Sequence, residues 1–85
     1  MNIRPREKEY TAEYFVLGSV PASPKEEREV TDFITERAAL KFTLTHPLYR
    51  REDITDMLID IHRKHRNMAL YRVKVSYWKK EAEQV

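Results

Sequence analysis

Two histidines and three cations lie within the six residues HRKHRN, from His62 to Asn67. Histidines three positions apart could begin a metal site, with His46 or Asp60 as a further ligand. The neighbouring arginine and lysine side chains would repel a dication, and they could instead bind phosphate groups. We therefore predict no metal and no cofactor. Two hypotheses for this segment remain, a nucleic-acid contact and the basic end of a helix.

The cations continue beyond this segment without an intervening acid. Seven of them lie between His62 and Lys80, whereas the rest of the chain carries nine cations and fourteen acids. Aromatic residues are interleaved with these cations, and aromatic faces can stack on unpaired bases while cations neutralise phosphates. This run predicts a surface that binds nucleic acid, either RNA or DNA, or an assembly that contains it. The predicted binding residues are Arg63, Lys64, Arg66, Arg72, Lys74, Trp78, Lys79 and Lys80.

The same surface fits a second hypothesis, a protein interface. Tryptophan and arginine are enriched at binding hot spots, so Arg72 and Trp78 could pack against an acidic protein partner or a second copy of the chain. The acids of residues 26–32 offer one complement in a homodimer. A third interpretation needs no partner, because lysines that face outward from an amphipathic strand are also typical of a solvated sheet face.

Composition argues against an enzyme and against a membrane protein. No cysteine is present, which excludes thiol catalysis, and a single glycine cannot form a glycine-rich phosphate loop. Asp53, Asp56 and Asp60 are more typical of a solvated helix face than of an acid/base pair. The N-terminus lacks the apolar segment of a signal peptide, and no apolar run approaches the roughly 20 residues that span a bilayer. We expect a non-enzymatic cytoplasmic protein.

The chain length predicts one domain. A domain of 85 residues buries only about 60 to 65% of the surface of its unfolded chain, so its stability is modest and a homodimer would increase it. Residues 1–8 have no apolar period and are predicted to be a flexible arm. Residues 9–80 are predicted to be the domain, and residues 81–85 a frayed tail.

Residues 9–17 are rich in aromatic and β-branched types and are expected to form the first strand. One side consists of Tyr10, Ala12, Tyr14 and Val16, and the other of Thr11, Glu13, Phe15 and Leu17. Because the later half is apolar on both sides, we predict a central strand. Gly18, the only glycine, predicts a bulge or a close backbone approach where this strand ends.

A capping motif marks the start of the first helix. Ser23 is predicted to be the N-cap, Pro24 the first helical residue, and Glu26 the partner that completes the capping box. The predicted buried stripe consists of Val30, Phe33, Ile34 and Ala38. Residues 40–45 then alternate between apolar and polar, which indicates a short strand, although a helix that continues to Leu44 fits the same letters.

A second helix is predicted from Arg50 to Arg66. Its buried stripe, at helical spacing, consists of Ile54, Met57, Leu58, Ile61 and His65. Acids precede cations along this segment, which suits a helix dipole, where each favourable terminal charge contributes about 0.3 to 1 kcal/mol. Asn67 tolerates the left-handed conformation that ends many helices. Such a helix would by itself account for HRKHRN.

Residues 69–78 are predicted to form the last strand. One side consists of Tyr71, Val73, Val75 and Tyr77, and the other of Arg72, Lys74, Ser76 and Trp78. The order β-α-β-α-β predicts a small α/β (or α+β) domain, in which two helices cover one face of a three-stranded sheet. The other face is expected to be open and to hold the function. Its predicted members are Arg72, Lys74, Trp78, Lys41, Thr43, Thr45 and the tyrosine side of the first strand.

Overall fold

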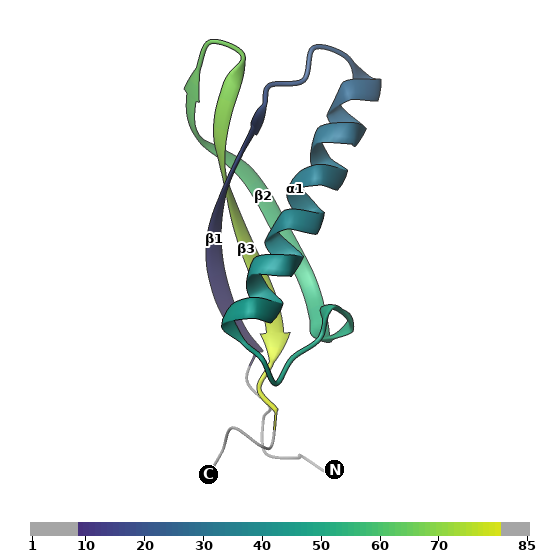
Figure 1. Cartoon of the computed structure of the whole chain (residues 1–85), viewed down its shortest axis with the longest axis vertical. Coiled ribbons are helices and arrows are strands. Elements are labelled where there is room, and N and C mark those ends of the chain that lie inside the picture. The colour runs from purple at the N-terminus through teal and green to yellow at the C-terminus, as the bar shows by residue number, and fades with distance from the viewer. Residues whose placement is uncertain (1–8, 81–85) are drawn as a thin grey trace, which may run out of the picture.

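One long helix lies across one face of a three-stranded antiparallel sheet in the computed structural model (Figure 1). The structure describes residues 9–80. The elements are β1 (Glu9–Ser19), α1 (Pro24–Thr45), the short 3-10 helix η1 (Arg51–Asp53), β2 (Ile54–His65) and β3 (Met68–Trp78). The strand order is β1-β3-β2, so β3 is central. The predicted arm at 1–8 and tail at 81–85 lie outside the described residues.

The predicted β-α-β-α-β order and its two helices are wrong. Residues 9–80 form a β-α-β-β arrangement, an α+β fold with a single α-helix, and both strand pairings are antiparallel. The segment predicted to be the second helix is η1 followed by β2. Because antiparallel strands can be joined by a two-residue turn, β2 and β3 need no helical crossover between them.

The sequence of β2 resembles that of a helix because a bulge interrupts the alternation of its apolar and polar residues. Met57 and Ile59 pack against the core two residues apart, as strand residues do. The register shift after Ile54 places this residue on the core side three positions before Met57, which is a helical spacing produced by a bulge. Leu58 and His65, predicted in the buried stripe, are both exposed, Leu58 by 61%. Pairing with β3 makes residues 54–65 a strand and not a helix.

The turn between β2 and β3 consists of Arg66 and Asn67. Arg66 has a φ of 59°, in the left-handed region that glycine and asparagine adopt more readily than arginine. Asn67, predicted to end a helix, lies in this turn, and its carbonyl accepts a hydrogen bond from the Val20 backbone N–H at 2.9 Å. That bond ties the hairpin to the connection between β1 and α1.

The predicted N-cap and first helical residue of α1 are confirmed, but the capping box is not, because the Glu26 carboxylate bonds to the backbone of Ala22 and not to that of Ser23. The Ser23 hydroxyl oxygen accepts a hydrogen bond from the Glu26 backbone N–H at 3.2 Å. The Glu26 carboxylate in turn accepts one from the Ala22 backbone N–H at 3.0 Å, and Pro24 begins the helix. Two backbone donors that would otherwise lack a partner are thereby satisfied.

The buried side of α1 extends beyond the predicted stripe. Ile34, Ala38 and Phe42 follow one another at four-residue spacing, and all are 0% exposed. Val30 is half-buried and packs against this cluster. Phe33, which was also predicted to be buried, is 47% exposed and lies on a different side of the helix.

Residues 40–45 belong to α1, so the predicted strand is wrong and the helical alternative is correct. Thr43 and Thr45 donate their hydroxyl protons to carbonyls of the preceding turn, Leu40 at 3.0 Å and Lys41 at 2.9 Å. Such bonds let threonine remain in a helix despite its low propensity. Lys41, Thr43 and Thr45 therefore do not lie on the open sheet face.

β1 has its two predicted sides but not its predicted position. The tyrosine side, which consists of Tyr10, Ala12, Tyr14 and Val16, packs against the core beneath α1 and not on the open face. β1 pairs with β3 alone, so it is an edge strand, and Phe15 and Leu17 on its other side are exposed. Gly18 makes the predicted close approach without a bulge, since a Cβ there would lie 3.0 Å from the Ile34 side chain.

β3 has both of its predicted sides. Its buried side consists of Tyr71, Val73, Val75 and Tyr77. At the end of α1, the His46 ring stacks on Phe42 with the ring centres 4.8 Å apart, and its two nitrogens lie 3.0 Å from the Thr45 hydroxyl and 3.3 Å from the Tyr77 hydroxyl. This histidine joins the helix end to the central strand.

Candidate functional site

The basic segment with the greatest exposure is the hairpin tip, residues 61–68, where β2 and β3 are joined (Figure 1). All eight of its residues are exposed. Arg63, Lys64 and Arg66 lie in it, and within residues 9–80 none of these three forms an ion pair. These cations were predicted to lie at the end of a helix, but they lie in and beside a tight β-turn.

The two histidines of the hairpin tip do not converge on a metal site. The His62 ring packs edge-on against Phe15 of β1, with the ring centres 5.1 Å apart. His65 pairs with Met68 beside the turn. Across residues 9–80, no cluster of three or more histidine or acidic side chains is arranged to hold a metal ion. His62 thus contributes an aromatic contact between the two edge strands.

Acids from the flanking strands surround the cations of the open face. The Arg72 Nε lies 3.4 Å from Asp60 on β2 and 4.0 Å from Glu13 on β1. Lys74 is the direct cross-strand partner of Glu13. Residues 62–80 contain no acid, but in the folded sheet acids of β1 and β2 lie beside their cations. A phosphate group would have to compete with these carboxylates for Arg72.

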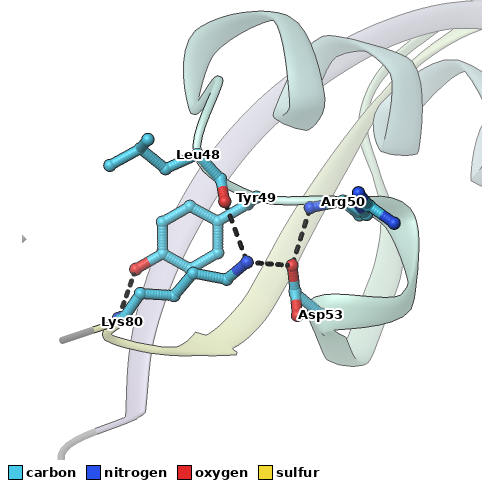
Figure 2. A network of polar contacts seen from close by, with 5 residues as sticks. All are labelled: Leu48, Tyr49, Arg50, Asp53 and Lys80. Atoms are coloured by element: carbon cyan, nitrogen blue, oxygen red, sulfur yellow. Dashed lines mark hydrogen bonds and ion pairs between the residues drawn. The ribbon is translucent and has the colours of Figure 1, made fainter. Parts of the chain in front are cut away.

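Lys80 belongs to a polar network that joins the chain after β3 to the turn before β2 (Figure 2). Its Nζ lies 2.9 Å from an Asp53 oxygen and donates to the Leu48 carbonyl at 2.8 Å. Its backbone N–H donates to the Tyr49 hydroxyl at 2.8 Å, and the Arg50 backbone N–H donates to Asp53 at 2.7 Å. These contacts give Lys80 a structural role.

The surroundings of Asp53 and Tyr71 shift the pKa values of these two side chains. The Arg50 backbone N–H, followed by Lys80, lowers the pKa of Asp53 below its ordinary value of 3.8. Burial raises the pKa of Tyr71, whose hydroxyl donates to the Ser19 carbonyl at 2.8 Å. Both groups are engaged in contacts that connect elements of the fold.

Trp78 and Lys79 lie at the opposite end of β3 from the hairpin tip. Trp78 is exposed across from Glu9 on β1, and the Lys79 Nζ is 5.8 Å from the ring centre of Tyr10. β3 has eleven residues, which corresponds to a length of about 35 Å. The predicted binding residues therefore form three separate groups, at the hairpin tip, on the open face and at the far end of β3.

A groove that was not predicted runs beside the outer edge of β1. This β1–α1 groove is lined by exposed apolar side chains of both elements, namely Phe15, Leu17, Phe33, Leu40 and Leu44. The sequence held one signal for it. Phe33, Leu40 and Leu44 are spaced seven and four residues apart, which places a second apolar stripe on a helix that already has a buried one.

Comparisons with protein families, curated proteins and solved structures find no match to this chain. Within residues 9–80, no helix combines the length and the apolar character that crossing a membrane requires.

Proposed function

We propose that this chain is a small non-enzymatic binding protein that contacts the phosphate backbone of nucleic acid through its hairpin tip. One observation carries the proposal: Arg63 and Lys64 at the end of β2 and Arg66 in the two-residue turn are all exposed, and none has an ion-pair partner among the described residues. Unpaired, exposed cations bind phosphate at the lowest cost, because they release the counterions of the nucleic acid without first breaking a salt bridge.

The shape of the hairpin tip suits this role. A two-stranded antiparallel ribbon is narrow enough to enter the major groove of duplex DNA or to follow a single backbone. At the same end of the molecule the start of α1 carries Glu26, Glu27 and Glu29 (Figure 1). These acids repel phosphate, so they confine a bound nucleic acid to the hairpin side.

The backbone of the turn supports a role for its cation. Arg66 occupies a left-handed position, φ 59°, at which glycine would be less strained. The strain costs about 1 kcal/mol, and strained backbone is concentrated at functional sites. The strained position of Arg66 therefore supports the hairpin tip as the site of contact.

The test is fluorescence anisotropy with labelled single-stranded RNA and duplex DNA. Three phosphate contacts predict a loss of affinity of about 40-fold between about 50 and 200 mM salt. The Arg63→Ala/Lys64→Ala variant is expected to bind at least about tenfold more weakly at the lower salt and to depend less on salt. No detectable binding at the lower salt would contradict the proposal.

A control of equal charge separates a local contact from a general effect of net charge. Lys25 and Arg28 are exposed on the first turns of α1, where the neighbouring acids disfavour phosphate. The Lys25→Ala/Arg28→Ala variant removes the same charge and is expected to change the affinity less than about twofold. Equal losses in the two variants would show that the hairpin tip is not the site.

A second candidate function, protein binding, is favoured by a different observation. Exposed apolar side chains gather around the outer edge of β1 in the β1–α1 groove. Scattered apolar residues on a surface need no explanation, but apolar residues that gather beside a free strand edge are typical of an interface.

A further inference from the structure

We infer that the outer edge of β1 and the β1–α1 groove form a homodimer interface, in which β1 pairs antiparallel with β1 of a second copy. Two three-stranded sheets thereby become one continuous sheet. This interface adjoins the hairpin tip, where His62 packs against Phe15, but it does not include the three cations of the tip, so it goes beyond the proposed nucleic-acid contact. It is tested without nucleic acid, so that the failure of one proposal does not imply the failure of the other.

The two edges of the sheet are protected to different degrees. β2 has two register shifts and carries Asp56, Asp60, Arg63 and Lys64, features that oppose pairing between edges. β1 pairs with β3 over eleven consecutive residues without a shift and contains neither proline nor lysine. Within residues 9–80, no backbone–backbone hydrogen bond involves the outer edge of β1. β1 is therefore the edge open to another strand.

Apolar side chains flank this free edge on both of its sides. On α1, Phe33, Leu40 and Leu44 form one exposed stripe, with Leu44 71% exposed. On β1, Phe15 and Leu17 are exposed on the side away from α1, Leu17 by 60%. Pairing at the β1 edge would remove apolar surface from water on both faces of the new strand pair. This burial would contribute a favourable hydrophobic free energy to dimerisation, because backbone hydrogen bonds alone contribute little.

The charges along the groove favour a second copy over a foreign partner. Arg37 and Lys41 line the groove toward the end of α1. Glu26 and Glu29 line an adjoining pocket beside the start of α1, which shares Leu17 and Phe33 with the groove. A two-fold axis perpendicular to α1 brings the acidic half of one helix against the basic half of the other. The surface is complementary to itself, which is the requirement of an isologous interface.

A single two-fold axis satisfies both elements. β1 and α1 run in opposite directions, one beside the other (Figure 1). The axis that makes the two β1 strands antiparallel therefore makes the two α1 helices antiparallel as well. Strand pairing and charge pairing require the same arrangement of the two copies.

Charge reversal tests this arrangement. The Glu26→Lys/Glu29→Lys variant places cations along the whole groove, and the Arg37→Glu/Lys41→Glu variant places acids there. Each alone is expected to dimerise at least about tenfold more weakly than the wild type, and an equimolar mixture is expected to form a heterodimer with restored affinity. Sedimentation equilibrium should give the wild type a mass that rises from about that of one chain at about 1 μM toward twice that mass at about 100 μM.

Leucine substitutions identify the surface involved. Leu40→Glu in the groove is expected to abolish the dimer, whereas Leu58→Glu, at an exposed leucine on the open face of β2, is expected to leave it intact. A wild type that stays monomeric throughout the concentration range overturns the inference. So does a mixture of the two charge-reversed variants that fails to associate, or a dimer that only Leu58→Glu disrupts.

Hydrogen exchange on the unmodified protein gives a test that depends on no variant. After dilution from about 100 to 1 μM, alternate amides of β1 are expected to exchange at least about tenfold faster, since they lose the partner strand. The exchange rates of β2 amides that bond to β3 should change much less. A uniform change across the sheet, or none, overturns the pairing of β1.

Discussion

At the residue scale, what a charged side chain can bind depends on the atoms beside it. Arg72 and Lys80 belong to the same acid-free run as Arg63. Arg72 nevertheless lies between two carboxylates, and Lys80 is held by Asp53 and by a carbonyl. A paired cation gains less from a phosphate than an unpaired one, because an existing contact must first be given up. Arg63 has no such contact within the described part of the chain.

Asp53→Asn tests the structural role of the Lys80 network. The substitution is expected to lower the free energy of unfolding by about 0.5 to 1 kcal/mol at about pH 7, since the ion pair is partly exposed. Folding lowers the pKa of Asp53, so its contribution is complete above the unfolded value of 3.8 and is lost as the pH falls through the folded pKa. Urea unfolding at about pH 7 and about pH 2.5 should show the difference between variant and wild type shrink with acid.

At the element scale, α1 has two apolar sides with different roles. Ile34, Ala38 and Phe42 face the sheet and are fully buried, whereas Leu40 and Leu44 face the groove and are exposed. A helix with one buried stripe needs no second one to fold. We propose that the exposed stripe contacts a second copy of the chain, so substitutions on the two sides should have different consequences.

Phe42→Ala is expected to lower the free energy of unfolding by about 3 to 5 kcal/mol, because it leaves a cavity at a site that is 0% exposed. Leu44→Ala, two residues away on the exposed side, is expected to cost less than about 0.5 kcal/mol in the monomer. Denaturant unfolding at about 1 μM protein measures both. Similar losses in the two variants would contradict the division of α1 into two sides.

At the scale of the whole molecule, one helix on one side of a sheet leaves much of a small protein exposed. A chain of 85 residues buries a limited fraction of its surface, so its stability is sensitive to any interaction that covers more of it. The hairpin tip and the β1–α1 groove adjoin through His62 and Phe15, but the three cations of the tip lie outside the groove. A dimer formed through β1 would thus leave the cations of both hairpin tips exposed.

Thermal unfolding should report the dimer through its dependence on concentration. A tenfold increase in protein concentration favours the dimer by about 1.4 kcal/mol, or about 0.7 kcal/mol for each chain. For a domain of this size the unfolding midpoint should rise by about 3 to 5 °C. The midpoints of the two charge-reversed variants, measured separately, should not depend on concentration. A wild-type midpoint that is constant over this range would be inconsistent with a dimer.

The sequence by itself determined the features that depend on neighbouring residues. Ser23 and Glu26 mark the start of α1, since their bonds join residues at most four positions apart. Strict alternation identified the two sides of β1 and β3. The three cations of the hairpin tip were likewise identified by residue type alone. The sequence did not predict that they lie in and beside a turn.

Only the tertiary structure decided how β2 folds and which surfaces are free. A bulged strand and a helix can have the same apolar spacing, and hydrogen bonds to β3, formed between residues distant in sequence, select the strand. Phe15 and Leu17 are exposed on β1, which is an edge strand. The pairing of β1 with β3 places Glu13 beside Lys74, so that an acid offsets the charge of a cation on the open face. The common physical reason is that these features depend on contacts between segments, which local spacing does not contain.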